Sequence, residues 1–442
     1  MAAKGSAKSG AKGTCSLDPR TPGTVVRPLV AADLFSGAGG ITLGLLSAGI
    51  DVRFCADINQ SCSTTHKRNF PDISFYLGDI RNLDPKLILD ACQTVPGELD
   101  ILMGGPPCQG FSIIGGRDIS DPRNGLFHDF IRIAKALQPK VIVIENVPGL
   151  ATLHNGEILR KIGSILDECG YNTGCAELLA AQYGVPQMRW RLVVIGWRRD
   201  LGISAGGFPT PSHGCLSIGE LVPNKTISPC HSDGFLTAAD AISDLPAIKS
   251  GETGKNYLSS PTGIYQQEMR RGLTNELYNH YAPKMSEINI RRINALKPGQ
   301  DWRDLPYELL PDGMKRALRK DHTRRFRRMR WDTVPRSIIT RFRDPKSGEY
   351  IHPDQTRTIS IREAARIQSF PDWFIFTGSN TDQYDQVGNA VPPLLAKAIG
   401  AEVAKVLMGE SSNTKHWPKC RYSFHTSFQA GLFSNSCEEL AA

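Results

Sequence analysis

Residues 29–40 read LVAADLFSGAGG, an apolar run that ends in a glycine-rich turn. The apolar part predicts a buried β-strand over Leu29–Phe35, and the glycines let the backbone approach a ligand closely at the carboxyl end of that strand. A dinucleotide-binding fingerprint requires glycine at the third position of GxGxxG, where this sequence has Thr42. The stretch therefore predicts the start of an α/β domain and argues against a dehydrogenase.

Short apolar runs and amphipathic stretches continue to alternate as far as Trp197. The wholly apolar run Val141–Ile144 is typical of a central parallel strand that is buried on both faces. Further strands are expected at Val52–Ile58, Ile73–Ile80, Asp100–Gly104, Lys140–Val147, Ala176–Ala180 and Arg191–Trp197. Helices are expected at Leu126–Leu137, Glu157–Cys169, Ile361–Gln368 and Pro393–Leu407, and we expect the last of these to pack on the sheet.

The composition and hydrophobic periodicity of the sequence change after Arg199. Residues 202–261 are studded with Gly, Pro, Ser and Thr, and residues 285–330 are basic and only patchily periodic. We therefore expect a second domain inserted into the first. The predicted division is a disordered basic tail (1–27), a catalytic α/β domain with a mostly parallel, doubly wound sheet (28–200 and 356–408), a smaller irregular domain (201–355) and a C-terminal tail (409–442).

Positive charge is concentrated in one short stretch of the second region. The formal net charge of +8 is by itself common among enzymes. Between residues 315 and 330, however, only Asp321 opposes a run of cations, namely Lys315, Arg316, Arg319, Lys320, Arg324, Arg325, Arg327, Arg328 and Arg330. A solvated helix face is the alternative explanation, but the density of charge favours a surface that contacts phosphates.

Cysteine spacing and hydropathy argue against several classes of protein. The 11 cysteines include no CxxC pair and no Cys/His ligand spacing, so we expect free thiols and no metal site. No stretch has the pattern of a signal peptide or of a membrane span. We expect the cytoplasm of a prokaryote, near its nucleoid, or the nucleus if the organism is a eukaryote.

Chemically active side chains follow successive predicted strands. Asp57 ends the second strand, where it can accept hydrogen bonds from ribose hydroxyls, and Asp79 ends the third, where it can accept one from an exocyclic amine. Either acid alone is more often a turn or cap residue. As an ordered set they favour a nucleoside ligand without a pyrophosphate. Cys108 follows the fourth strand after Pro106-Pro107, a position that suits an activated thiolate better than a buried apolar cysteine.

The loop that follows Cys108 and the next two strands add charged groups. Residues 110–124 are glycine-rich and include Arg117, and we expect a mobile loop that closes on a phosphate backbone. Glu145 ends an apolar strand, where a carboxyl should be hard to ionise and could donate a proton. Arg189 and Arg191 are two residues apart, so in an extended backbone they project to the same side and could hold an anion or a carbonyl oxygen.

Four motifs occur in order: PPCQGFS at 106–112, ENV at 145–147, QYGVPQ at 182–187 and QVGNAVPP at 386–393. With them the chain resembles the cytosine-5 DNA methyltransferases, from about Leu29 to Leu407. DWRDLP at 301–306 and SIREAARIQSFP at 360–371 are similar to bacterial members and to the catalytic part of animal maintenance enzymes.

The resemblance implies an S-adenosylmethionine-dependent methyltransferase fold whose inserted domain recognises the target sequence. The reaction would be methylation of carbon 5 of a cytosine flipped out of duplex DNA. Cys108 would add to carbon 6, and Glu145 would hold ring nitrogen 3 and the exocyclic amine. Arg191, helped by Arg189, would hold the carbonyl oxygen of the base.

The resemblance also implies which residues contact the cofactor. S-adenosylmethionine would be held by Phe35, Gly37, Gly39, Asp57, Ile58, Asp79, Ile80, Pro107, Leu126, Asn389 and Val391. We place DNA contacts at Ser112, Arg117, Arg324, Arg325, Arg327 and Arg328. Two departures from the family pattern are Asp57 in place of glutamate and Trp190 in place of a glutamate between the two arginines, which leaves the ion-pair partners of those arginines open.

Two other functions are weighed against DNA methylation. A tRNA-methylating branch of the family typically has PPCQPFT and a Cys-Phe-Thr tripeptide, whereas this chain has Gly110 and no such tripeptide. A catalytically inactive DNA-binding regulator tends to lose the cysteine or the acids, which are present here. We expect a prokaryotic modification enzyme that acts as a monomer on duplex DNA and is paired with a restriction endonuclease.

Overall fold

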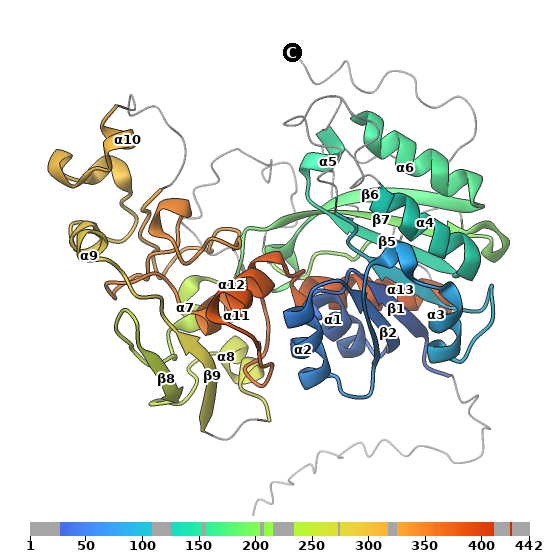
Figure 1. The fold of residues 1–442 in the computed structure, drawn as a ribbon, viewed down its shortest axis with the longest axis horizontal. Coiled ribbons are helices and arrows are strands. Elements are labelled where there is room, and N and C mark those ends of the chain that lie inside the picture. The colour runs from blue at the N-terminus through green and yellow to red at the C-terminus, as the bar shows by residue number, and fades with distance from the viewer. Residues whose placement is uncertain are drawn as a thin grey trace, which may run out of the picture.

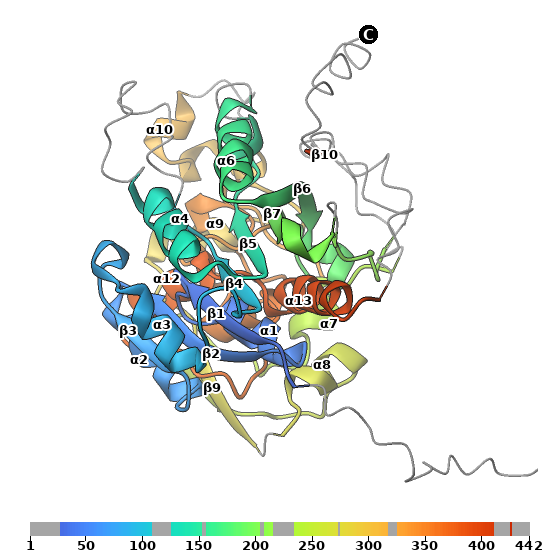
Figure 2. The same cartoon turned by 90° about the vertical axis from the view of Figure 1, so that its right-hand side faces the viewer.

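The computed structural model describes residues 27–107, 125–152, 156–203, 207–214, 234–272, 275–316, 325–410 and 425–426. Its larger part is a sheet with helices on both faces (Figures 1 and 2). The elements of this part are β1 (Val30–Leu34), α1 (Gly40–Ser47), β2 (Asp51–Asp57), α2 (Gln60–Asn69), β3 (Ser74–Leu77), α3 (Pro85–Cys92), β4 (Ile101–Gly104), α4 (Gly125–Leu137), β5 (Val141–Asn146), α5 (Gly149–Thr152), α6 (Glu157–Glu168), β6 (Tyr171–Leu179), β7 (Trp190–Arg198), α13 (Pro393–Leu407) and β10 (His425–Thr426).

The strand order of the sheet is β10-β6-β7-β5-β4-β1-β2-β3. Strands β1 to β6 all run in one direction, and β7 runs antiparallel between β5 and β6. The order reverses between β1 and β4, which in open α/β sheets is where ligands bind, at the carboxyl ends of the strands. The predicted doubly wound, mostly parallel sheet is confirmed.

Each face of the sheet has its own apolar core. Helices α3, α4 and α6 pack on one face against alternate side chains of the strands, and α1 and α13 pack on the other. This alternation follows from the period of two along a strand. The prediction that Pro393–Leu407 returns to the sheet is confirmed, and the helix has the predicted bounds.

The second region consists of short elements joined by irregular chain, and it lies beside the sheet (Figure 1). Its elements are α7 (Ala238–Ile242), β8 (Thr253–Asn256), α8 (Ile264–Met269), β9 (Glu276–Tyr281), α9 (Glu287–Asn294) and α10 (Asp312–Lys315). Helices α11 (Ile361–Ile367) and α12 (Asn380–Asn389) follow this region in the chain and contact each other. Two contacts cross the division that the sequence predicts. Phe208 packs with the core of the sheet, and α11, expected in the catalytic domain, packs with α7 and β9.

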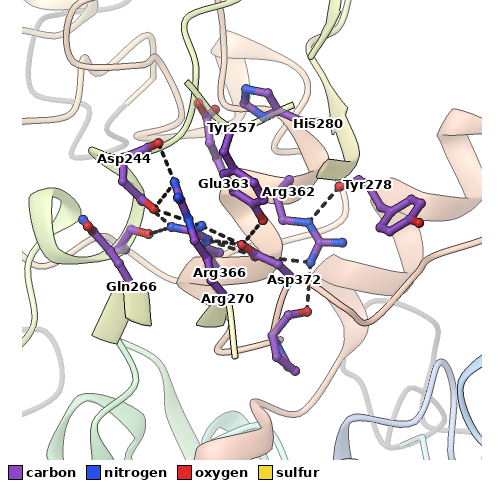
Figure 3. Close-up of polar contacts among 12 residues, drawn as sticks. Asp244, Tyr257, Gln266, Arg270, Tyr278, His280, Arg362, Glu363, Arg366 and Asp372 are labelled. Carbon is purple, nitrogen blue, oxygen red and sulfur yellow. Dashed lines mark hydrogen bonds and ion pairs between the residues drawn. The ribbon is translucent and has the colours of Figure 1, made fainter. Parts of the chain in front are cut away.

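Helix α11 is held by a network of fully buried charges (Figure 3). Arg366 pairs with Asp372, with 2.6 Å between Nη2 and Oδ2, and also with Asp244. Arg362 donates to the carbonyl oxygen of Phe374 at 2.7 Å. Buried charges of this kind are tolerated only when they are paired and hydrogen-bonded. The arginines of the SIREAARIQSFP motif therefore build the interior of the second region.

Candidate active site

A glycine-rich loop follows β1 at the point where the strand order reverses. Phe35 (φ 59°), Gly37 (φ 54°) and Gly39 (φ 103°) all have left-handed backbone conformations. At Gly39 a side chain is also excluded by space, because a Cβ would lie 2.7 Å from the ring of Phe70. The loop thus presents backbone rather than side chains to the carboxyl edge of the sheet, as the sequence predicted.

Asp57, at the end of β2, braces this loop. Its Oδ2 accepts a hydrogen bond from the N–H of Gly37 at 2.9 Å, and its Oδ1 accepts one from Asn59 at 2.8 Å. Burial raises the pKa of Asp57, and these two hydrogen bonds oppose the rise. The neighbouring Ile58 is 69% exposed, which leaves an apolar side chain uncovered at the same edge.

Asp79, after β3, already has a partner. Arg81 lies beside it, with 2.9 Å between Nε and Oδ2, and its hydrogen bonds lower the pKa of Asp79. An exocyclic amine would therefore share this carboxylate with Arg81, a partner that the sequence analysis did not foresee.

Glu145 and Arg191 form an ion pair at the ends of adjacent strands. Arg191 Nε lies 2.7 Å from Glu145 Oε1, and both side chains are largely buried. The expected apolar surroundings of Glu145 are therefore wrong, because β7 runs antiparallel to β5 and delivers a guanidinium to the carboxyl end of β5. The pair also supplies the ion-pair partner of Arg191 that the sequence left open.

The segment that precedes Cys108 is tied to the same strand. Asn146 Nδ2 donates to the carbonyl oxygen of Pro106 at 2.9 Å. A Cβ on Gly105 would lie 3.3 Å from Glu145 Oε2, so the absence of a side chain there keeps space open beside that oxygen. Cys108 itself lies outside the described residues, two positions beyond Pro106.

Arg189 does not share the orientation of Arg191. Its side chain is buried and donates hydrogen bonds to Ser337 Oγ and to the carbonyl oxygens of Ile338, Gly388 and Ala390. The period-two argument was wrong here because β7 begins only at Trp190. Burial lowers the pKa of Arg189, nearby Arg191 lowers it further, and Glu145 opposes both.

The far end of the chain returns to this edge, as the sequence predicted. The carbonyl oxygen of Val391 lies 2.2 Å from the position of a Cβ on Gly40, at the start of α1. Asn389 ends α12 and is exposed. Pro107 follows β4, Leu126 lies in the first turn of α4, and the remaining expected cofactor residues lie at or just after the ends of β1, β2 and β3. They are Phe35, Gly37, Gly39, Asp57, Ile58, Asp79 and Ile80.

Only some of the arginines in the basic run at 315–330 are exposed to solvent. Arg325 is exposed, whereas Arg327 pairs with Glu349, with 3.2 Å between Nε and Oε2. Arg328 is 8% exposed, and its guanidinium donates only to backbone carbonyls, those of Ile293, Leu296, His352 and Gln355. The structure thus argues against a DNA contact at Arg328, because none of its described hydrogen bonds faces outward. Ser112, Arg117 and Arg324 lie outside the described residues.

A buried polar cluster behind the glycine loop was missed. Thr42 donates to Asp33 Oδ2 at 2.7 Å and lies 3.3 Å from His66 Nε2. Burial raises the pKa of Asp33 to about 7 and lowers that of His66 to about 4. From the sequence, Thr42 was used only as evidence against a dinucleotide-binding motif, and no structural role was predicted for it. A hydroxyl on α1 facing an acid on β1 was the available signal.

Gln187, part of the QYGVPQ motif, is a second residue whose role the sequence did not predict. Its Oε1 accepts from the N–H of Ile338 at 2.7 Å, and its Nε2 donates to Gln368 Oε1 at 2.9 Å.

Among the described residues no group of three or more His, Cys, Asp or Glu is placed to hold a metal ion. No helix within the described ranges is long and apolar enough to span a membrane.

The sheet order and the site define an α/β fold of the methyltransferase type. Residues 29–405 match the model of the C-5 cytosine-specific DNA methylases. The type II methyltransferase M.AgeI of Thalassovita gelatinovora is 34% identical over 85% of this chain and 98% of its own length. The type II methyltransferase M1.HphI of Haemophilus parahaemolyticus is 35% identical over 86% of this chain and 88% of its own.

A solved structure agrees with these relatives. A protein described as a DNA modification methyltransferase encoded within an E. coli prophage has a TM-score of 0.65 and 26% identity, over 86% of this chain and 99% of that one. The chain belongs to the C-5 cytosine-specific DNA methylase family and is a DNA cytosine-5 methyltransferase.

The substitution Asp33→Asn should change how stability depends on pH. The raised pKa means that Asp33 ionises less readily in the folded protein than in the unfolded chain, so stability is lost as pH rises from about 4 to about 7. Asparagine keeps the acceptor for Thr42 and does not ionise. Between pH 4 and pH 8 the stability of the wild type should fall relative to the variant by up to about 4 kcal/mol.

Urea unfolding of both proteins across this pH range measures that difference. His66 is present in both proteins, so its own titration cancels. A constant difference in unfolding free energy would show that Asp33 does not titrate in this window.

Proposed function

We propose that this enzyme methylates carbon 5 of a cytosine within a specific duplex DNA sequence, with Cys108 as the nucleophile and S-adenosylmethionine as the methyl donor. The observation that carries the proposal is the Glu145–Arg191 pair, beside the segment that leads into Cys108. A carboxylate held by a guanidinium is an oriented acceptor for the edge of a base. Family membership supplies the rest of the support.

The residues around the glycine loop fit S-adenosylmethionine. The loop offers backbone next to open space at Gly37, where a Cβ would have no neighbour within 4 Å. Asp57 and Asp79 supply acceptors for hydroxyls and an amine, and exposed Ile58 supplies an apolar surface for a purine ring. Bound S-adenosylmethionine would supply an electrophilic methyl group at this edge.

The chain's own residues would make the cytosine reactive. The Cys108 thiolate adds to carbon 6 of the flipped base, which raises electron density at carbon 5. Glu145 in its protonated form, oriented by Arg191, accepts from the exocyclic amine with one oxygen. With the other it passes its proton to ring nitrogen 3 as negative charge develops there, and it takes that proton back when Cys108 leaves. After carbon 5 has gained the methyl group, a water molecule accepts the carbon 5 proton, the double bond between carbons 5 and 6 re-forms, and the bond to sulfur breaks so that Cys108 leaves as the thiolate. Each flip costs a few kcal/mol, which contacts with the backbone and the site must offset.

The enzyme's partners are part of the proposal. The relatives named type II methyltransferases support a role in DNA modification, and we propose that a restriction endonuclease acts on the same sequence. We propose that one copy of the chain acts on each site. Bisulfite sequencing of DNA from cells that express the chain would identify the target sequence.

Replacement of Cys108 by serine should abolish methyl transfer without loss of the cofactor site. A serine hydroxyl is a far weaker nucleophile than a thiolate, so transfer should fall about a thousandfold or more. The measurement is transfer of a labelled methyl group to duplex DNA and, in parallel, to tRNA. S-adenosylhomocysteine binding serves as the control and should stay within about twofold. Substantial turnover by the serine variant would refute the nucleophile, and label in tRNA alone would refute the DNA substrate.

Removal of one exposed charge in the basic run should weaken the salt dependence of DNA binding. Arg325 is exposed, and each phosphate contact contributes about 0.9 to the slope of log affinity against log salt. Arg325→Gln should therefore lower that slope by about 0.9, as measured by filter binding to duplex DNA. Lys135→Gln, on exposed α4 surface, removes the same charge elsewhere and is the matched control. Equal slopes for both variants would mean that the run is a solvated face.

A further inference from the structure

Three segments of the chain meet at one buried junction. They are the segment that leads into β7, with Gln187 and Arg189, then residues 337–340 of the second region, and residues 387–391 at and just after the end of α12. The first leads into the catalytic pair, the second belongs to the inserted region, and the third carries the expected cofactor residues Asn389 and Val391. Contacts among the three segments therefore connect the Glu145–Arg191 pair, the inserted region and the expected cofactor residues, which lie far apart in the sequence.

Arg189 holds two of these segments with one guanidinium. Its Nη1 donates to Ser337 Oγ at 3.1 Å and to the carbonyl oxygen of Ile338 at 2.6 Å. Its Nη2 donates to the carbonyl oxygens of Gly388 at 3.2 Å and Ala390 at 3.1 Å. Each segment therefore supplies two of these four acceptors, and all four hydrogen bonds of the buried charge form only when both segments are in place.

Two glutamines extend the same link. The N–H of Ile338 donates to Gln187 Oε1 and its carbonyl oxygen accepts from Arg189, so both of its backbone groups are bound by the segment that leads into β7. Gln187 Nε2 donates to Gln368 Oε1, and Gln368 Nε2 donates to the carbonyl oxygen of Val387 at 2.7 Å. A second chain of hydrogen bonds thus runs from residue 338 to the end of α12.

At Gly388 the two segments touch backbone to backbone. A Cβ there would lie 2.4 Å from the nitrogen of Thr340 and 2.6 Å from the carbonyl carbon of Ile339. Ile339 begins a turn, closed by a hydrogen bond from Phe342 N–H at 3.1 Å, and both Ile339 and Arg341 are exposed. Because the two backbones pack directly against each other, a displacement of this turn would also displace residues 388–391.

We propose that Arg189 and Gly388 couple DNA binding to cofactor binding, so that each ligand raises the affinity for the other. This rests on the proposed function and adds one contact to it, that of DNA with exposed Ile339 and Arg341, where the guanidinium can meet a phosphate. The cofactor is taken to contact Asn389 and Val391. DNA that holds the turn fixes residues 337–340, and Arg189 then fixes the carbonyls of residues 388 and 390. By thermodynamic linkage the cofactor strengthens DNA binding by the same factor. Arg189 is thus a positioning residue.

Equilibrium dialysis of labelled S-adenosylhomocysteine tests the coupling. Its dissociation constant is measured with and without saturating sonicated, unmethylated bacteriophage λ DNA. For the wild type the DNA should tighten cofactor binding by about 5-fold to 150-fold. For Arg189→Met the ratio should fall to about twofold or less, because a methionine makes none of the four hydrogen bonds.

Arg328→Met is the matched control. Arg328 is also buried and also donates to four backbone carbonyls, but its acceptors, on Ile293, Leu296, His352 and Gln355, all lie within the second region. Loss of this arginine should destabilise the fold in the same way yet leave the ratio of dissociation constants unchanged. An Arg189→Met protein that keeps the wild-type ratio, or an Arg328→Met protein that loses it, would overturn the proposal.

Gly388→Ala gives a second route if Arg189→Met does not fold. The added methyl group must push residues 388 and 340 apart, so the ratio should fall, whereas Gly313→Ala, with nothing within 4 Å of its Cβ, should not change it. A Gly388→Ala protein with the wild-type ratio overturns the proposal. Wild-type protein that binds both ligands without any coupling refutes this inference alone, whereas failure to bind S-adenosylhomocysteine refutes the proposed function as well.

Discussion

The antiparallel course of β7 between β5 and β6 is the constraint on which the candidate site depends. In a fully parallel sheet the start of β7 would lie at the opposite edge from the carboxyl end of β5. Because β7 is reversed, Arg191, near the start of β7, lies beside Glu145, near the end of β5, and the two form an ion pair. The same reversal places Gln187 and Arg189 where the second region and the end of α12 meet, so Arg191 of the ion pair and the residues of the junction come from one short segment.

Buried arginines are a second theme of the molecule. Arg189, Arg328, Arg357, Arg362 and Arg366 are all buried and bind carbonyl oxygens or carboxylates of the protein itself. Irregular chain offers many backbone carbonyls that no helix or strand satisfies, and a guanidinium, with several donors in one plane, can bind segments far apart in sequence. The many arginines of the second region therefore stabilise its interior, and a high content of basic residues there is not by itself evidence of phosphate binding.

Much of the sheet domain could be predicted from the sequence, because apolar periodicity and glycine placement are local signals. The helix at Pro393–Leu407 and the acids after β2 and β3 lie where they were expected. The errors concern partners that are distant in sequence. Arg328 looked like part of a charged surface because the run Lys315–Arg330 says nothing of Ile293 or Gln355. Glu145 looked isolated because the direction of β7 cannot be read from its residues.

The central claim is that the sulfur of Cys108 becomes covalently joined to a cytosine that Glu145 and Arg191 hold. The most direct measurement is to incubate the wild-type protein with S-adenosylmethionine and duplex DNA in which 5-fluorocytosine replaces cytosine. Fluorine cannot leave as the proton does, so the account predicts a denaturation-resistant complex whose adduct maps by mass spectrometry to Cys108. Recovery of unmodified protein, or an adduct at another residue, would contradict it.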